Sequence, residues 1–299
     1  MEALRRCGRG GRSGLRAPSG EATHCHRSGQ RLTTSVIIPT FNESKNIGWV
    51  LRRLPPVDEI LVVDRCSPDR TGEIAKALHN RVRVINEPRR GKGTALRTGF
   101  DAAACDVVVM VDADGSMDPA EIPLYVDGIA QGYDFVKGSR FMAGGGSDDI
   151  TPTRALGNHV LTRTTNLLFM SRFTDLCYGF MAFRRSALPD LRLSSTGFEI
   201  ETEIVVNAVM ANLRILEVPT HERQRRFGES NLRAIRDGQR VLSTILRERF
   251  GTWNHDELTL VKGRSSAATA TNPHDIEDEE VIDLRADSLL STAHEPSAP

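Results

Sequence analysis

The stretch "VVVMVDADG", residues 107–115, decides the fold class of this 299-residue chain. Its first five residues are all apolar, which is typical of a strand buried on both faces of a sheet. Two aspartates, Asp112 and Asp114, and a glycine follow. Because side chains alternate along an extended chain, acids two residues apart leave it on the same side. The stretch therefore predicts a buried strand that delivers two carboxylates to one edge of a sheet.

Similar apolar stretches occur on both sides of this strand, with helical patterns between them. Further strands are expected at 35–40, 58–64, 81–86, 133–140, 177–188 and 214–219. Helices are expected at 42–54, 69–78, 91–104, 153–170, 198–213 and 232–250. This alternation predicts an α/β fold with a mostly parallel sheet covered by helices on both faces. Ligands of such folds bind beyond the carboxyl ends of the strands.

Two of the expected helices carry apolar residues along one side. In 153–170 these are Leu156, Val160, Leu167 and Leu168. In 232–250 they are Leu232, Ile235, Val241, Leu242 and Ile245, and they oppose Arg233, Arg236, Arg240, Arg247 and Arg249. Two interpretations of the second helix stay open: it packs against the core, or it lies on an anionic membrane surface.

The two ends of the chain differ in charge from the neutral whole. Residues 1–34 carry seven arginines and two glutamates, a net charge of +5, and residues 264–299 carry two arginines and eight acids, a net charge of −6. Both ends are poor in aromatic residues, so we expect a disordered basic tail over 1–34 and a disordered acidic tail over 251–299. The N-terminal segment lacks the apolar region of a secretory signal, which leaves a transit peptide or a mis-assigned start.

The spacing of the cysteines and the hydropathy of the chain indicate in which cellular compartment the protein is expected. The five cysteines are widely spaced and form no C-x-x-C pair, so we expect reduced thiols in a cytoplasmic protein. No apolar run approaches the ~18 residues of a membrane-spanning helix. Cytoplasmic localisation is therefore expected, with peripheral contact at the cytoplasmic face of the membrane as a further expectation.

The carboxylate pair Asp112 and Asp114 suits a hard divalent cation, Mg²⁺ or Mn²⁺, bound together with ligand phosphates. The alternative is a turn that caps the next helix through Asp118 and Pro119. Arginines suited to phosphate contacts gather in the second half of the chain, at positions 140, 154, 163, 225 and 226. The segment "GKGT" (91–94) does not match a Walker P-loop, but a helix that begins at Lys92 still favours an anion.

Several motifs in fixed order resemble family 2 glycosyltransferases over about residues 35–248. They are "SVIIPTFNES", "EILVVDRCSPDRTGEIA", "GKGTALRTGF", "VVVMVDADGSMDPAEIP" and "DFVKGSRF". The later motifs "TDLCYGFMAFRRSAL", "GFEIETEI" and "RRFGESNL" resemble the branch with dolichyl- and polyprenyl-phosphate hexosyltransferases. The resemblance implies a GT-A fold over 35–250, with a nucleotide-sugar half (35–140) and an acceptor half (141–250). It also implies a UDP- or GDP-sugar donor, Mg²⁺ or Mn²⁺, and inversion at the anomeric carbon.

The same resemblance implies roles for individual residues. Residues expected to bind the donor are Pro39, Phe41, Glu43, Asp64, Lys92, Asp112, Ala113, Arg140 and Ser230. Asp112 and Asp114 would hold the metal, while Arg225 and Arg226 would neutralise phosphates during transfer. The chain departs from the family at Arg65, where a small polar residue is usual, so the preferred nucleobase stays open.

The expected reaction is a one-step displacement in which an acceptor oxygen attacks the anomeric carbon. A sugar hydroxyl would need a general base, for which Asp175 and Glu201 are the preferred candidates, beside Glu199 and Glu203. A polyprenyl phosphate, the favoured acceptor, is already an anion and needs none. A soluble saccharide or natural-product acceptor, and a non-catalytic nucleotide-sugar-binding protein, are the alternatives. A nucleotidyltransferase is disfavoured because "IPTFNES" lacks a glycine-rich loop, and no nucleic-acid partner is expected.

Overall fold

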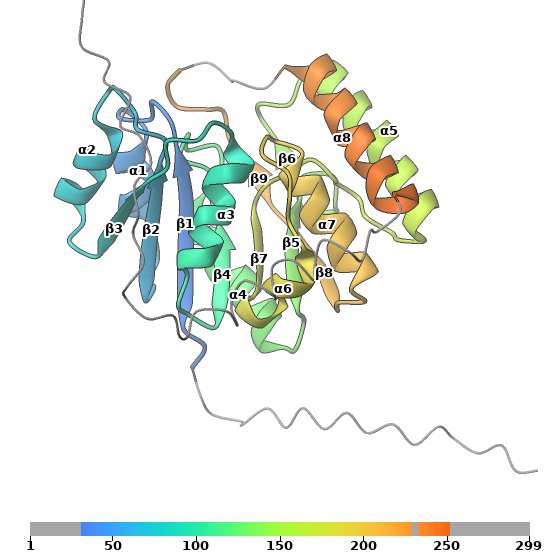
Figure 1. Ribbon diagram of the computed structural model, residues 1–299, viewed down its shortest axis with the longest axis horizontal. Helices are drawn as coiled ribbons and strands as arrows, with labels where there is room; N and C mark the ends of the chain where they lie inside the picture. Colours follow the sequence, from blue (N-terminus) through green and yellow to red (C-terminus); the bar gives the residue numbers. More distant parts are fainter. Residues whose placement is uncertain (1–30, 229–232, 252–299) are drawn as a thin grey trace, which may run out of the picture. The chain divides into compact units, whose positions relative to one another are not determined.

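The computed structural model describes residues 31–228 and 233–251. In this part of the chain a seven-stranded sheet has the order β3-β2-β1-β4-β7-β5-β8 (Figure 1). Its strands are β1 (Thr34–Thr40), β2 (Glu59–Asp64), β3 (Val82–Asn86), β4 (Val107–Met110), β5 (Phe135–Ser139), β7 (Met181–Arg184) and β8 (Ile215–Pro219). A small parallel ladder joins β6 (Gly146–Ser147) to β9 (His221–Glu222).

Strand direction explains why one edge of the sheet collects the polar residues. Strands β1, β2, β3 and β4 pair in parallel, as do β5 and β8. Only β7, inserted between β4 and β5, runs antiparallel to both neighbours. Every other strand of this sheet therefore points the same way, and the carboxyl ends meet at one edge. The predicted mostly parallel α/β sheet is confirmed.

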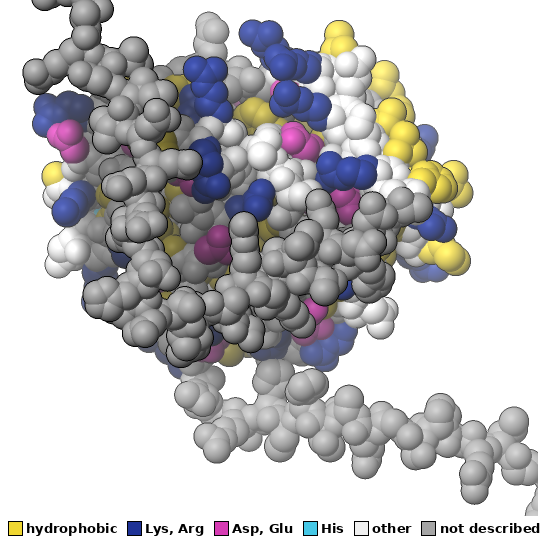
Figure 2. Space-filling model, viewed as in Figure 1, with side chains coloured by type: hydrophobic (Ala, Val, Ile, Leu, Met, Phe, Trp, Pro, Cys, Tyr) yellow, Lys and Arg dark blue, Asp and Glu magenta, His cyan; other side chains and the backbone are white. Residues whose placement is uncertain are grey.

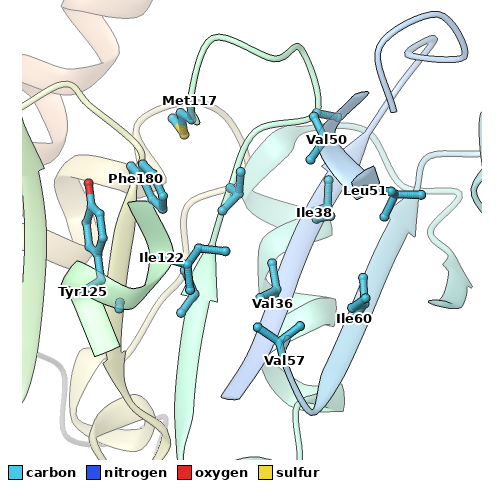
Figure 3. Close-up of a cluster of buried hydrophobic side chains, with 14 of the residues drawn as sticks. Val36, Ile38, Val50, Leu51, Val57, Ile60, Met117, Ile122, Tyr125 and Phe180 are labelled. Atoms are coloured by element: carbon cyan, nitrogen blue, oxygen red, sulfur yellow. The ribbon is translucent and has the colours of Figure 1, made fainter. Parts of the chain in front are cut away.

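Helices cover both faces of the sheet. They are α1 (Ile47–Arg53), α2 (Thr71–Leu78), α3 (Lys92–Ala102), α4 (Ile122–Ala130), α5 (Pro152–Phe169), α6 (Leu188–Leu191), α7 (Ile200–Met210) and α8 (Ala234–Phe250), with short 3₁₀ turns at η1 (Pro119–Glu121) and η2 (Arg185–Ala187). Because side chains alternate along β1, Val36 and Ile38 join one core cluster and Ile37 joins the other. Figure 3 shows the first cluster, where Val50 of α1 and Ile122 of α4 also lie.

Two local expectations at the polar edge are wrong. The first helix begins at Ile47 rather than near Asn42, and Asn42 adopts a left-handed conformation with φ of 60°. Strand β4 ends at Met110, so Asp112 and Asp114 belong to the turn that follows. The two acids therefore come together through the turn and not through alternation along a strand.

Helix α5 is oriented opposite to what its apolar pattern suggests. Leu156 and Leu167 are 66 % and 80 % exposed, while Asn158, Thr162 and Thr165 are buried. The side-chain oxygen Oδ1 of Asn158 accepts hydrogen bonds from the backbone N–H groups of Leu176 and Cys177. These bonds explain why this polar side faces inward. Leu156, Val160 and Leu167 therefore face solvent, whereas Leu168 of the expected apolar side packs against the second core cluster.

Helix α8 packs against α5 and α7. Its buried residues include Val241 and Ile245, so the core-packing interpretation holds for that face. Ile235 and Leu242 are exposed, however. One side of the helix thus packs against the core, and a second apolar stripe stays exposed to solvent.

The N-terminal boundary lies slightly earlier than expected. Thr34 already belongs to β1, and the Thr33 hydroxyl donates a hydrogen bond to Asp106 at 2.8 Å. The rest of the predicted basic tail, and the predicted acidic tail beyond Gly251, lie outside the described residues. None of the helices in 31–228 and 233–251 is long and apolar enough to cross a membrane.

Candidate active site

A cavity of about 480 Å³ opens at the edge where the parallel strands end. Residues 35–140 contribute Pro39, Thr40, Phe41, Glu43, Arg65, Gly91, Lys92, Ala95, Asp112, Ala113, Asp114, Ser116, Met117 and Arg140. Residues 141–250 contribute, among others, Asp149, Arg154, Cys177, Tyr178, Gly179, Phe198, Glu201, Glu222 and Arg225. The structure therefore brings most of the residues singled out in the sequence to one cavity.

Lys92 joins two carboxylates on the floor of this cavity. Its Nζ lies 2.6 Å from Oδ1 of Asp112 and 2.6 Å from Oε1 of Glu201. Although burial acts to lower it, the two carboxylates raise the pKa of Lys92 above its ordinary value. Burial, together with the charges of Asp114 and Glu201, raises the pKa of Asp112 to about 6, against the opposing effect of Lys92. Lys92 thus holds an acidic pair from the two halves of the domain together.

Two glycines permit this arrangement. Gly91, with φ of 114°, lies so close to the 195–197 segment that a Cβ would come within 2.0 Å of the Thr196 carbonyl oxygen. A Cβ on Gly179 would lie 2.5 Å from Oε1 of Glu201 and 3.3 Å from Nζ of Lys92. Any other residue at either position would displace the start of α3 or the Lys92–Glu201 pair.

Arg225 occupies a similar bridging position beside the second aspartate. Its guanidinium lies 2.8 Å from Oδ2 of Asp114 and 3.1 Å from Oε1 of Glu43. Burial raises the pKa of Glu43, against the hydrogen bond from Asn46 and the charge of Arg225. Oδ1 of Asp114 accepts the N–H of Ser116, which fixes the turn. Arg225 therefore connects the loop after β9 to Glu43 and Asp114, two cavity acids of residues 35–140.

The donor set at Asp112 and Asp114 fits part of a divalent metal site. Both carboxylates reach the same cavity, and the charge of Asp114 is close enough to raise the pKa of Asp112. Within the described residues no group of three or more His, Cys, Asp or Glu side chains forms a complete site. Two carboxylates suit Mg²⁺ or Mn²⁺ only when water or ligand phosphates supply the other oxygens.

Arg140 lines the cavity with little of its surface exposed and is bound to acids. Its Nε lies 2.7 Å from Oδ2 of Asp175, and its Nη1 lies 3.1 Å from Oε2 of Glu222. Burial works to raise the pKa of Asp175, but Lys137 and Arg140 hold it below its ordinary value. Asp175 is fully buried and is not among the residues that line the cavity. This geometry gives Asp175 a positioning role toward Arg140, and its predicted role as a base stays a prediction.

Asp64, at the end of β2, is directed toward neighbouring loops. Its Oδ1 accepts hydrogen bonds from the hydroxyls of Thr40 (2.8 Å) and Ser67 (2.6 Å), and it does not line the cavity. Arg65 does line it and stacks on Phe41, with the guanidinium carbon 3.4 Å from the ring centroid. Burial and the nearby Arg90 lower the pKa of Arg65. The departure from the family motif therefore forms part of the cavity wall, beside the expected nucleoside pocket.

The remaining predicted residues divide between the cavity and its surroundings. Arg226 is turned away from the cavity and lies over the ring of Trp49, 5.1 Å from its centroid. Arg163 is exposed on α5. Glu203 is buried and accepts the N–H groups of Ser194 and Ser195, so it does not face the cavity. Ser230 lies outside the described residues.

Three arginines at the cavity rim were not among the residues expected to contact ligands. Arg233, Arg236 and Arg240, hereafter the rim arginines, precede or belong to the first turns of α8 and line the cavity. All three are exposed. Their spacing of three and four residues places them near one face of the helix. This spacing is the feature of the sequence that could have predicted a shared arginine cluster.

Sequence comparison agrees with this geometry. Residues 35–192 match the model of glycosyl transferase family 2. The chain is 35 % identical over 219 residues to polyprenol monophosphomannose synthase of Mycolicibacterium smegmatis, covering 67 % of this chain and 80 % of that protein. It is 33 % identical over 212 residues to dolichol-phosphate mannosyltransferase of Pyrococcus furiosus, covering 68 % of this chain and 60 % of that longer protein.

A solved structure supports the fold. Glucosyl-3-phosphoglycerate synthase from Mycobacterium tuberculosis, in complex with Mn²⁺, uridine diphosphate and phosphoglyceric acid, matches with a TM-score of 0.59 and 23 % identity. The match covers 73 % of this chain and 79 % of that one. The fold is therefore of the GT-A type, as expected. Together with the family match, this places the chain in glycosyl transferase family 2, as a glycosyltransferase.

Proposed function

We propose that this glycosyltransferase moves a hexose from a nucleotide-diphosphate sugar to a polyprenyl phosphate, with inversion and with a divalent metal. The observation that carries the proposal is the placement of Asp112 and Asp114 in a cavity whose rim bears Arg233, Arg236 and Arg240. A metal-and-diphosphate site and a second anion site would thus share one cavity. The relatives named for polyprenol- and dolichol-phosphate mannose transfer support this choice of acceptor.

The donor side of the cavity would bind the nucleotide through its walls and the diphosphate at its acids. A bound Mg²⁺ or Mn²⁺ would supply positive charge to the diphosphate as it departs. Asp112 and Asp114 would hold that ion, and Arg225 would exchange its contact with Asp114 for a phosphate oxygen. Phe41 and Arg65 would form the wall against the nucleobase.

The acids of the cavity favour an acceptor that is already an anion. Each carboxylate that lines the described part of the cavity has a cationic partner, as four ion pairs illustrate: Glu43–Arg225, Glu201–Lys92, Glu222–Arg140 and Asp149–Arg154. In these ion pairs the carboxylates already contact cations of the protein rather than an incoming hydroxyl group. A phosphate oxygen attacks without a base, which fits this pairing.

The rim arginines supply the acceptor side of the proposal. Asp237 pairs with Arg240 at 3.8 Å, and the Arg233 N–H donates to the same carboxylate. No acid within hydrogen-bond or ion-pair distance of the Arg236 guanidinium is found among the described residues. An arriving phosphate would therefore find an exposed guanidinium directed to the cavity mouth, with bidentate geometry available.

The experiment is a transfer assay with purified protein. UDP- and GDP-hexoses are each incubated with Mn²⁺ and a short-chain prenyl phosphate, and mass spectrometry follows both the hexosyl prenyl phosphate and the released nucleoside diphosphate. We expect one donor to give a metal-dependent lipid product. Asp114→Asn should abolish it, whereas the matched control Asp127→Asn, an exposed acid on α4, should not.

Two results would contradict the proposal. Robust transfer to a soluble saccharide, with none to any prenyl phosphate, would identify the soluble-acceptor alternative. Donor binding in a thermal-shift assay with neither transfer nor hydrolysis would identify a non-catalytic nucleotide-sugar-binding protein instead.

A further inference from the structure

Exposed apolar side chains gather on two adjacent helices beside the cavity. On α5 and its C-terminal cap they are Leu156, Val160, Leu167 and Met170, and on α8 they are Ile235, Leu242, Leu246 and Phe250. We call these eight residues the apolar face. Helices α5 and α8 lie side by side (Figure 1), and Figure 2 shows hydrophobic side chains gathered along that side of the molecule.

The helical positions make the apolar face continuous along each helix. On α8, Ile235, Leu242 and Leu246 follow one another at intervals of seven and four residues, so they share one side. A different side of α8, about 100° around the helix, is already buried through Val241 and Ile245. The exposed stripe is therefore not needed for packing of the described domain.

The exposure is large for side chains of this kind. Met170 is 93 % exposed and Ile235 is 80 % exposed. Inward, α5 buries Thr162 and Thr165, whose hydroxyls have no hydrogen-bond partner among the described residues. Leu161, Leu168 and Phe169 of α5 pack against the core, but the exposed Leu156, Val160 and Leu167 add no burial in water. Contiguous exposed apolar surface of this kind marks an interaction site.

The charges around the apolar face are mostly positive. Helices α5 and α8 carry six arginines (Arg154, Arg163, Arg236, Arg240, Arg247 and Arg249) and two acids. Both acids are occupied, because Asp237 pairs with Arg240 and Glu248 pairs with Arg247 at 2.8 Å. An apolar stripe bordered by arginines matches the interfacial region of a bilayer that contains anionic lipids.

The apolar face also adjoins the mouth of the cavity. On α8, Ile235 immediately precedes Arg236, a rim arginine that lines the cavity. On α5, Arg154 lines the cavity two residues before Leu156. A surface on which both helices lay would therefore be next to the cavity opening.

We propose that the apolar face docks on an anionic lipid bilayer and brings the cavity mouth to the headgroup region. The proposal deepens the proposed function and rests on it for the identity of the acceptor. The apolar side chains would enter the interface, and Arg163 and Arg249 would contact lipid phosphates. A phosphate whose prenyl chain stays in the bilayer would then reach the rim arginines without leaving the membrane.

Charge argues against a second copy of the chain as the occupant. A two-fold dimer brings the same surface patch of both copies together. Arg163, in the middle of the α5 stripe, would then be buried beside the partner's arginines, because α5 offers no acid and both acids of α8 are already paired. Anionic headgroups remove this repulsion.

The test is vesicle flotation of the full chain, with phosphatidylcholine vesicles with and without roughly 30 % phosphatidylglycerol. We expect the protein to float with the anionic vesicles. Leu167→Gln/Ile235→Gln should weaken this binding about tenfold or more, and Arg163→Gln about fivefold. The matched control is Leu78→Gln, which removes a half-exposed leucine from α2.

Further measurements separate the outcomes. Unchanged flotation of Leu167→Gln/Ile235→Gln would overturn the proposal. Light scattering without vesicles tests the alternative: a lower particle mass of the variant than of the wild type would identify a protein–protein interface and would also overturn the proposal. The variant should still transfer hexose to a soluble short-chain prenyl phosphate at the wild-type rate. Vesicle binding in a wild-type protein that transfers to no prenyl phosphate would refute the proposed function and leave the docking surface intact.

Discussion

The bridge from Lys92 to Asp112 and Glu201 makes a quantitative prediction for Lys92→Met. Both ion pairs have a separation of 2.6 Å, and the three side chains are 11 %, 24 % and 12 % exposed. At an effective dielectric constant of about 20, each pair contributes about 6 kcal/mol of Coulomb energy before the cost of desolvation. Removing one partner of a buried pair costs about 3–5 kcal/mol, and we take about 3 because Asp112 is partly exposed. For a domain of this size that corresponds to a fall in Tm of about 6–12 °C.

The assay is equilibrium urea unfolding followed by circular dichroism. Glu201→Gln should cost only about 1 kcal/mol, because Lys92 keeps Asp112. The double variant should be less destabilised than the sum of the two single variants by about 1 kcal/mol or more. Additive effects, or a loss below about 1 kcal/mol for Lys92→Met, would refute the bridge.

The pH dependence of the same variant gives an independent check. With Lys92 present, the pKa of Asp112 is already raised to about 6. Without Lys92 it must rise further, because Lys92 lowers it. Protonation then relieves the repulsion between Asp112 and Glu201. The free energy of unfolding of Lys92→Met should therefore approach the wild-type value as pH falls toward about 6, because over that range Asp112 of the variant binds its proton before Asp112 of the wild type does.

Three further predictions concern other ion pairs. Arg225→Gln should bind Mn²⁺ alone about fivefold more tightly, because Asp114 is released, yet bind the nucleotide sugar more weakly, and calorimetry with each ligand checks both signs. Arg140→Met should lose about 3–5 kcal/mol in urea unfolding, since it leaves Asp175 buried without its ion-pair partner; a loss near zero would contradict the pairing. Hydrogen bonds from Arg89 and Thr98 lower the pKa of Glu87 to about 2. The stability due to Glu87 is therefore complete above about pH 4.5 and is lost as pH falls toward 2, so Glu87→Gln should show a flatter stability profile there.

Much of the fold could be predicted because buried parallel strands have a local signature. The apolar stretch before Asp112 contains β4, and comparable stretches contain β1 and β2. The antiparallel direction of β7 could not be predicted, because it depends on the path of the long segment between β5 and β7, which contains β6 and α5. The side of α5 that faces the protein could not be predicted from its hydrophobic pattern either. Its leucines indicate an amphipathic helix, but only tertiary contacts show that Asn158 faces the protein.

The site divides in the same way. Asp112, Asp114 and Lys92 follow strand ends or begin a helix, so their place at the polar edge follows from the topology. The ion-pair partners of these residues come from distant segments. Nothing local to Arg225 shows that it binds Asp114 and Glu43, or that the neighbouring Arg226 turns to Trp49 instead. Asp64 and Asp175 illustrate the opposite case: both are acids in promising positions of the sequence, but their carboxylates bind other protein groups and do not line the cavity.

The account depends most on a divalent cation held by Asp112 and Asp114 together with the nucleotide. Electron paramagnetic resonance of Mn²⁺, titrated into the protein with and without UDP or GDP, measures this directly. We predict that one nucleotide tightens Mn²⁺ binding, and that Asp114→Asn weakens the ternary complex by at least about tenfold, while Asp127→Asn leaves it unchanged. Mn²⁺ binding by Asp114→Asn that equals the wild type would contradict the account.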